Sequence, residues 1–302
     1  MHPQILIMSQ APHKAGFVSI VGKPNVGKST LMNALVGEKL SIITSKAQTT
    51  RHRIMGILNG DDFQIVYSDT PGIIKPQYAL HESMMSFVRT SLEDADIILF
   101  VTDIYEKHDE DDVIKRLQHA EVPILLLINK IDQATEEEVQ EKVAYWQEKM
   151  NPTEIHPISA LHNFGVEQLF NRLMALLPEH PAFYPKDELT DKPERFFVSE
   201  MIREKIFLNY KKEIPYSTEV VVEEFKEEED IIRIRAEISV ERKSQKGIVI
   251  GHKGEALKKV GTQARLDMEQ FFQKKIFLDL YVRVNENWRT DQKLLRRFGY
   301  SE

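Results

Sequence analysis

The stretch that most constrains the fold of this chain is residues 22–29, Gly-Lys-Pro-Asn-Val-Gly-Lys-Ser. It fits the phosphate-binding loop Gly-x-x-x-x-Gly-Lys-Ser/Thr at every defined position. Residues 16–21 before it are typical of a short buried strand, and residues 30–36 after it are typical of a helix start. A strand, a glycine-rich turn and a helix N-terminus together favour phosphate, so we expect a nucleotide here.

Each part of this loop has an expected role. Gly22 and Gly27 let the backbone curl so that its N–H groups point at phosphate oxygens. Lys28 would reach the β- and γ-phosphates, and the Ser29 hydroxyl would bind Mg²⁺. The predicted nucleotide-binding residues of the loop are Gly22, Lys23, Pro24, Asn25, Val26, Gly27, Lys28, Ser29 and Thr30.

Apolar runs alternate with amphipathic stretches from Phe17 to about Leu177. The runs lie at residues 63–67, 97–101, 124–128 and 154–158. This alternation predicts an α/β domain with a mostly parallel sheet and helices on both faces. In such sheets ligands bind beyond the carboxyl ends of the strands. The three motifs described next each follow one of these runs, which places them at that edge.

The tetrapeptide Asp69-Thr-Pro-Gly72 follows the first of these four runs. An Asp at a strand end near a phosphate loop can hold Mg²⁺, directly or through water, and the Gly72 N–H would face the γ-phosphate. The same tetrapeptide also makes a good turn, so its assignment depends on the neighbouring motifs.

Two further motifs concern the base. In Asn129-Lys130-Ile-Asp132, the Asp132 carboxylate can accept both donors of the guanine edge, N1–H and the exocyclic amine. Adenine has no such donor pair and would leave the carboxylate buried and unpaired, at a cost of about 1–3 kcal/mol. Backbone N–H groups of a second motif could bind guanine O6, and its residues are Ser159, Ala160 and Leu161.

These four motifs, in this order, resemble those of P-loop GTPases of the translation-factor-like branch. The resemblance implies a first switch at residues 41–53, with Thr50 as the ligand of Mg²⁺ and the γ-phosphate and Thr49 as the alternative. The implied metal ligands are therefore Ser29, Thr50 and Asp69. The residues expected to act in catalysis are Lys28, Thr50 and Gly72.

The second switch would begin at Gly72 and run through Ile73, Ile74 and a helix starting near Tyr78. Ras-like GTPases have a water-positioning glutamine at the position of Ile73. An aliphatic side chain cannot orient water, so we expect slow intrinsic hydrolysis with the missing group supplied from elsewhere. Two sources stay open, a partner and a potassium ion at Asn25, a residue that is equally consistent with ordinary turn chemistry.

Three prolines within residues 177–185 mark a domain boundary. We expect an N-terminal extension that need not be ordered at residues 1–14, the GTPase domain at 15–180, a linker at 181–194 and a second domain at 195–302. The second domain has the predicted order helix, strand, strand, helix, helix, strand. Residues 241–302 carry 14 Lys and Arg against 8 Asp and Glu, in a chain of net charge −7, which suggests an anionic partner.

A Gly-x-x-Gly loop, Gly251-His-Lys-Gly254, lies between the two adjacent predicted helices of this basic module. The arrangement resembles an α+β type II KH domain, whose loop clamps about four nucleotides of single-stranded RNA. The predicted RNA-binding residues are Lys246, Gly251, His252, Lys253, Gly254 and Lys258.

From Phe17 to its end the chain resembles the Era-like family of bacterial GTPases, which belongs to the TrmE-Era-EngA-like branch. The resemblance includes the first-switch sequence at residues 46–53, the segment at 195–217, and the ending with Trp288 and Tyr300, which implies a C-terminal helix. It implies GTP or GDP and Mg²⁺ as cofactors. It also implies that the protein binds the single-stranded 3′ end of small-subunit (16S) ribosomal RNA in the GTP state and assists small-subunit assembly.

The resemblance also implies a cytoplasmic protein, with loose peripheral association with the inner membrane left open. We expect a monomer and no DNA partner. Disulfides and thiolate metal sites are excluded because the chain has no cysteine, and its longest apolar runs are far shorter than the ~20 residues of a membrane span. Two alternatives stay open: a GTPase that docks on a membrane or protein through its basic module, and an RNA-binding scaffold that never turns over nucleotide.

Overall fold

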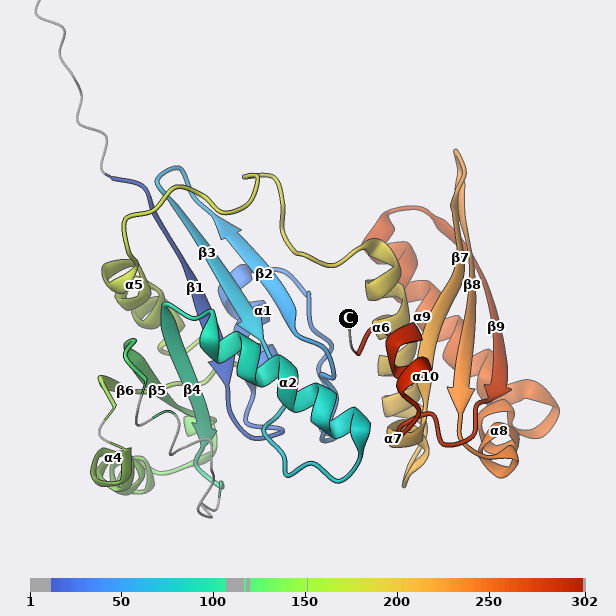
Figure 1. The fold of residues 1–302 in the computed structure, drawn as a ribbon, viewed down its shortest axis with the longest axis horizontal. Coiled ribbons are helices and arrows are strands. Elements are labelled where there is room, and N and C mark those ends of the chain that lie inside the picture. Colours follow the sequence, from blue (N-terminus) through green and yellow to red (C-terminus); the bar gives the residue numbers. More distant parts are fainter. Residues whose placement is uncertain (1–11, 107–116, 118–119, 151, 301–302) are drawn as a thin grey trace, which may run out of the picture.

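The computed structural model describes residues 12–106, 117, 120–150 and 152–300. Its first domain is a six-stranded sheet in the order β2-β3-β1-β4-β5-β6 with helices on both faces (Figure 1). The elements are β1 (Lys14–Val21), α1 (Lys28–Val36), β2 (Ile54–Asn59), β3 (Phe63–Asp69), α2 (Ala79–Glu93), β4 (Ile97–Asp103), β5 (Ile124–Asn129), α4 (Glu136–Met150), β6 (Glu154–Pro157) and α5 (Val166–Leu176).

Five of the six strands run parallel, which confirms the predicted mostly parallel sheet. Strands β4 and β5 are buried along their whole length because helices cover both of their faces. The exception is β2, an antiparallel edge strand that pairs with β3 and was not among the predicted apolar runs. Gly56 interrupts its apolar pattern, and an added Cβ there would lie 2.8 Å from the Val36 side chain.

The segment between the domains lies along β2 and is not a free linker. The Ile57 N–H donates to the Leu189 carbonyl at 2.8 Å, and the Met55 N–H donates to the Asp191 carboxylate at 3.0 Å. Gly56 and Thr190 form an isolated antiparallel bridge. These contacts cover the edge of the sheet at β2. An uncovered edge strand could pair with a strand of another chain, so this cover protects against aggregation.

The second domain is a three-stranded sheet in the order β7-β8-β9. Strands β7 and β8 form an antiparallel hairpin, while β9 runs parallel to β8. Helices α6, α8 and α9 contribute the apolar core on one face. The elements are α6 (Glu194–Asn209), α7 (Ile214–Ser217), β7 (Glu219–Glu227), β8 (Ile231–Val240), α8 (Lys243–Ile250), α9 (Glu255–Phe272), β9 (Lys275–Val284) and α10 (Gln292–Arg297).

The predicted element order of this domain is confirmed, with two local differences. The one-turn helix α7 was not predicted because its four residues are too few to show a helical period. The spacing of Val260, Ala264, Met268 and Phe271 predicts one shared helical face, but Phe271, next to the C-terminal end of α9, is 44% exposed while the other three are buried.

The N-terminal boundary differs slightly from the prediction, since Lys14 already belongs to β1. Most of the predicted extension at residues 1–14 lies outside the described residues. Among the described residues, no helix combines the length and the apolar character needed to cross a membrane.

The end of the chain packs back onto the first domain. Trp288, Leu295 and Phe298 belong to the same apolar cluster as Leu80 and Met84 of α2. The Trp288 indole N–H donates to the Ser217 carbonyl at 2.9 Å, and the Leu80 N–H donates to the Arg289 carbonyl at 3.0 Å. The two domains therefore share a core at α2.

Candidate functional site

The glycine-rich loop between β1 and α1 has the close packing that its sequence requires. Gly27 has φ of 99°, and a Cβ on it would lie 2.2 Å from the Asn129 amide nitrogen. A Cβ on Gly22 would lie 2.1 Å from the Val101 carbonyl oxygen. No other residue fits either position, so the backbone can approach a ligand closely.

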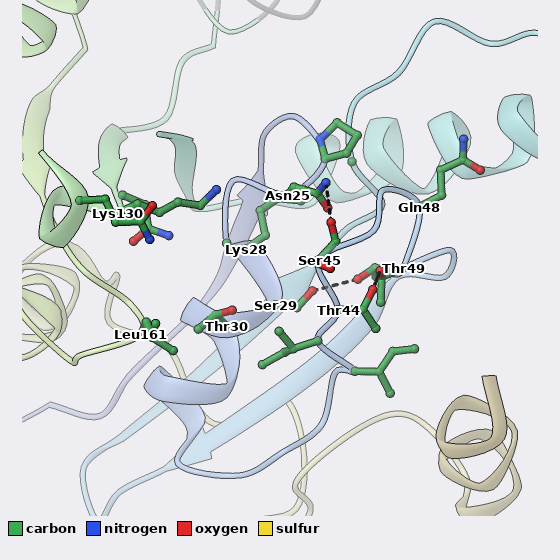
Figure 2. A pocket seen from close by; sticks show the side chains of 18 of the residues that line it. Asn25, Lys28, Ser29, Thr30, Thr44, Ser45, Gln48, Thr49, Lys130 and Leu161 are labelled. Carbon is green, nitrogen blue, oxygen red and sulfur yellow. Dashed lines mark hydrogen bonds between the residues drawn. The ribbon is translucent and has the colours of Figure 1, made fainter. Parts of the chain in front are cut away.

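A cavity of about 360 Å³ lies at the carboxyl ends of the central strands, next to this loop (Figure 2). Its volume lies within the range of small-molecule and cofactor sites, about 300–1,000 Å³. Twelve of the residues predicted from sequence to contact nucleotide line it: Pro24, Asn25, Gly27, Lys28, Ser29, Thr30, Thr50, Gly72, Asn129, Lys130, Asp132 and Leu161.

The other predicted residues lie behind this lining and hold it in place. The Asn129 amide nitrogen donates to the Val26 carbonyl at 2.8 Å, and its oxygen accepts from the Ala160 N–H at 3.0 Å. The Ser159 hydroxyl donates to Asp132 at 2.5 Å. The predicted base motifs thus brace the phosphate loop as well as lining the cavity.

Lys28 is buried beneath the loop. Its ammonium donates to the carbonyl oxygens of Gly22 at 3.1 Å and Lys23 at 2.9 Å. Burial lowers the pKa of Lys28 to about 8, against the opposing attraction of Asp69 and Glu106. A bound phosphate would supply the negative charge that stabilises the protonated form.

Three predicted metal ligands come together from three separate segments. The Ser29 hydroxyl donates to Asp69 Oδ2 at 2.7 Å and lies 2.9 Å from the Thr50 hydroxyl, which is 3.5 Å from Asp69 Oδ2. Asp69 Oδ1 is buried without a hydrogen-bond partner among the described residues. Burial raises the pKa of the Asp69 carboxyl, although Lys28 and the three hydroxyls that contact it act in the opposite direction.

This donor set fits Mg²⁺. Hydroxyl and carboxylate oxygens are the ligands that a hard divalent cation prefers, and the unpartnered Asp69 Oδ1 is a free acceptor. The geometry favours Thr50 over Thr49, because the Thr49 hydroxyl is already occupied by the Thr44 hydroxyl at 2.6 Å and the Lys46 carbonyl at 2.7 Å.

Sequence reasoning missed most of the cavity wall that the first switch, residues 41–53, supplies. Ser41 donates to Asp69 Oδ2 at 2.9 Å, and Asn25 donates to the Ser45 carbonyl at 3.3 Å. No residue-type motif marks these positions, and only the resemblance to GTPases placed a switch there. The additional lining residues are Ile42, Ile43, Thr44, Ser45, Gln48, Thr49 and Gln133.

Ile73 does not line the cavity. Its N–H donates to the Gly22 carbonyl at 3.0 Å, and its side chain packs against the cluster shared by α2 and the end of the chain. The structure therefore offers no polar side chain at the position of the Ras-like glutamine.

The guanine-reading carboxylate predicted from sequence faces the cavity. The hydrogen bond from Ser159 lowers the pKa of Asp132, which keeps the carboxylate ionised at neutral pH. Lys130 has φ of 65°, and its ammonium donates to Asp103 at the end of β4 at 2.6 Å. The site thus presents an acceptor pair suited to two adjacent N–H donors.

A second cavity of about 370 Å³ lies on the other domain, between α9 and β9. Of the predicted RNA-binding residues, Gly254 and Lys258 line it, while Lys246 on α8 and Gly251, His252 and Lys253 in the loop do not. The remaining lining residues were missed, although Lys258, Thr262 and Arg265 share one helical face: Leu257, Gly261, Thr262, Arg265, Leu278, Asp279 and Leu280.

Comparisons with known proteins identify a family for each of the two domains. The family described as 50S ribosome-binding GTPase matches residues 17–130, and the KH domain family matches residues 213–289. GTPase Era of Syntrophus aciditrophicus is 47% identical over 293 residues, covering 96% of each chain. A chloroplastic GTPase ERA-like protein of Oryza sativa subsp. japonica is 45% identical over 96% of this chain and 70% of that relative.

Solved structures give the same result. A crystal structure of Era in complex with MgGDPNP and nucleotides 1506–1542 of 16S ribosomal RNA superposes with a TM-score of 0.91 at 38% identity, covering 96% of this chain and all of that one. A variant of Aquifex aeolicus Era bound to GDP and AlF4⁻ matches with the same score and identity. With this identity extending through both domains, the chain belongs to the Era family of GTPases.

Proposed function

We propose that this protein binds the single-stranded 3′ end of 16S ribosomal RNA in the groove between α9 and β9, preferentially in its GTP state, and so assists assembly of the small ribosomal subunit. The observation that carries the proposal is the groove itself, which the Gly-x-x-Gly loop and Lys258 border in the basic module. A similar Era protein has been crystallised with nucleotides of this RNA.

As a member of the Era family the protein is a GTPase that acts on GTP with Mg²⁺. In the proposed site Ser29, Thr50 and Asp69 hold the metal, directly or through water. Lys28 and the Gly72 N–H stabilise the charge that develops on the phosphates, and Asp132 selects guanine. Bound Mg²⁺ would supply further charge stabilisation on the β- and γ-phosphates.

Slow turnover follows from the position of Ile73, which cannot orient water. The missing group would come from a partner or from a potassium ion at Asn25. The Asn25 amide nitrogen is engaged with the Ser45 carbonyl, so its amide oxygen would be the potassium ligand. Turnover should then be faster in potassium than in sodium, and equal rates would remove the cation from the proposal.

In the proposed complex, some residues contact the phosphates of the RNA and others contact its bases. Glycines at 251 and 254 let phosphates approach the loop, and Lys246, His252, Lys253 and Lys258 add donors and positive charge. Thr262, Arg265 and Asp279 line the same cavity, where their polar groups can contact base edges. Single-stranded RNA fits this surface because its bases can be splayed into the groove.

The test is the affinity for a short RNA of the 16S 3′-end sequence, with a GTP analogue or GDP bound. Lys258→Glu should weaken binding by roughly tenfold and reduce the salt dependence, whose slope is about 0.7 per phosphate contact. Lys259→Glu is the matched control, because this exposed lysine is adjacent on α9 but does not line the groove. Equal effects of the two substitutions would contradict binding in the groove.

We further propose that the protein acts as a monomer in the cytoplasm. Peripheral membrane association is the competing use of the basic module, and anionic vesicles provide the comparison. If vesicles bind tightly while RNA binds weakly and independently of nucleotide, the module serves a membrane and the RNA proposal fails.

A further inference from the structure

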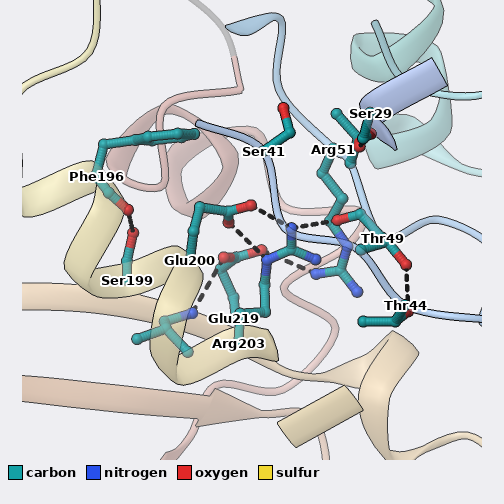
Figure 3. Close-up of polar contacts among 12 residues, drawn as sticks. Ser29, Ser41, Thr44, Thr49, Arg51, Phe196, Ser199, Glu200, Arg203 and Glu219 are labelled. Carbon is teal, nitrogen blue, oxygen red and sulfur yellow. Dashed lines mark hydrogen bonds and ion pairs between the residues drawn. The ribbon is translucent and has the colours of Figure 1, made fainter. Parts of the chain in front are cut away.

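The second domain is hydrogen-bonded to the first switch at Thr49 and Arg51, the two residues next to Thr50 in the sequence (Figure 3). The Arg203 guanidinium, on α6, donates to the Thr49 carbonyl, and the Lys46 ammonium donates to the carbonyls of Phe207 and Tyr210 at the end of the same helix. Thr50 thus lies in a segment whose neighbours are bonded to the other domain.

Arg51 forms further hydrogen bonds between the two domains, near the start of β7. Its guanidinium donates to the Glu219 carboxylate at 2.9 Å. It also donates to three main-chain carbonyls in and beside α7, those of Thr218 at 2.8 Å, Pro215 at 3.0 Å and Tyr216 at 3.2 Å. One switch side chain therefore binds three main-chain carbonyls and one carboxylate of the second domain.

The orientation of the Arg203 side chain is fixed by contacts within the second domain. Its side chain is 1% exposed and forms a bidentate ion pair with Glu200, at 2.7 Å for both bonds. Burial alone would lower the pKa of Arg203, but the Glu200 carboxylate outweighs that effect and raises it. A planar guanidinium held in this way points the second N–H of Nη2, the one that Thr49 accepts, in one fixed direction.

The bond to Thr49 acts on Thr50 directly. The Thr49 carbonyl belongs to the same planar peptide unit as the Thr50 N–H, so holding that oxygen fixes the backbone from which the Thr50 side chain extends. The Thr50 hydroxyl lies 2.9 Å from Ser29. We propose that Arg203 is a positioning residue of the GTPase reaction, which holds Thr50 at the metal site from the second domain.

This inference rests on the proposed role of Thr50 as ligand of Mg²⁺ and the γ-phosphate. It predicts that hydrolysis on the first domain depends on a side chain of the second domain that contacts neither substrate nor metal. Only the triphosphate state would be affected, because GDP has no γ-phosphate for Thr50 to contact.

The test replaces both partners of the buried pair, Glu200→Met with Arg203→Met, so that no unpaired buried charge remains. We expect turnover to fall by roughly 10- to 100-fold and the Mg²⁺ concentration for half-maximal turnover to rise, while GDP affinity changes less than about twofold. Lys39→Ala is the control, since it removes the interdomain ion pair with Glu204, 3.0 Å long, without touching Thr49.

Thr50→Ala, measured beside these variants, separates the inference from the proposed site. If Thr50→Ala lowers turnover and the Glu200–Arg203 double variant does not, the positioning role is overturned while the metal site stands. If Thr50→Ala has no effect, the proposed role of Thr50 has failed. An equal loss of GDP affinity in the double variant would show a general structural defect and would also overturn the positioning role.

Discussion

Lys28 is a charged residue that is only 6% exposed. Its burial makes the affinity of the site for nucleotide depend on pH. Without nucleotide its pKa is about 8, so it loses its proton as the pH rises through that value. Bound phosphates hold the proton on the ammonium. Nucleotide binding above pH 8 must therefore take up a proton, and affinity should fall by up to about tenfold per pH unit there.

Calorimetry of GDP binding at pH 7 and pH 9 checks this, in two buffers of different ionisation enthalpy. The apparent enthalpy should depend on the buffer at pH 9 much more than at pH 7. Lys28→Arg keeps its charge throughout this range and should lose the difference. The same buffer dependence at both pH values would contradict the proposed contact between Lys28 and the phosphates.

Asp132 is the residue whose chemistry sets the choice of base. Asp132→Asn should shift preference from guanosine toward xanthosine triphosphate, because an amide donates to the xanthine C2 carbonyl that a carboxylate repels. A discrimination change of roughly 10³-fold or more is expected when the acceptors that pair with the substrate's N–H groups are exchanged for a donor. Competition binding of the two nucleotides to the variant and wild type measures it, and an unchanged ratio would mean that the base is read elsewhere.

At the scale of elements, the end of the chain stabilises the junction between α2 and the second domain. Trp288 is fully buried, and its indole N–H is bonded to Ser217. Trp288→Ala should cost about 3–5 kcal/mol of unfolding free energy through the cavity it leaves. Trp288→Phe should cost less, since it keeps most of the apolar contact and loses the hydrogen bond. Urea unfolding compares them, and a loss below about 1 kcal/mol for the alanine variant would contradict this role.

Elements with strong patterns were predictable from the sequence, and so were the motifs that follow them. The four predicted runs became β3, β4, β5 and β6 because each is short and followed by a turn, although β6 contains Glu154 and His156 and is only half-buried. Strand β2 was not predicted because Gly56 interrupts its apolar pattern, and helix α7 was not predicted because it has only one turn. Their formation depends on tertiary partners, which no local pattern records.

In the candidate site, too, some residues were predictable from the sequence and others were not. Lys28, Asp69, Asn129 and Asp132 were predictable because fixed spacing links them to chemistry. Ser41 and Gln48 were not, because the path of the first switch alone brings Ser41 to Asp69 and Gln48 to the cavity wall. Likewise, the sequence contained both Arg203 and Thr49 but nothing that indicated they touch, since their pairing depends on how the two domains dock.

At the scale of the whole molecule, both switches contact the second domain. The first does so through Arg51, and the second through Tyr78, which lies under the Arg289 guanidinium at 4.9 Å from its ring centroid. If the γ-phosphate orders both switches, nucleotide and RNA share one coupling free energy. The factor by which a GTP analogue strengthens RNA binding must then equal the factor by which RNA strengthens binding of the analogue.

Arg289→Ala should reduce that factor by roughly two- to thirtyfold, because it removes the contact to Tyr78 and leaves the nucleotide cavity and the groove intact. Affinity for GDP alone, and for RNA in the GDP state, should change little. Equilibrium titrations of each ligand in the presence and absence of the other give the factor. An unchanged factor would exclude the second switch from the coupling.

The segment paired with β2 also limits how far the domains can separate. Asp191 is bonded to the strand, and α6 begins at Glu194, so only Lys192 and Pro193 connect two ordered parts of the chain. A tether of three Cα–Cα steps reaches at most about 10 Å, whereas all of residues 181–194 could reach about 45 Å. Even with every switch contact broken, the KH domain would remain at a high effective concentration beside the GTPase domain. It would swing about a pivot and re-dock without a diffusive search.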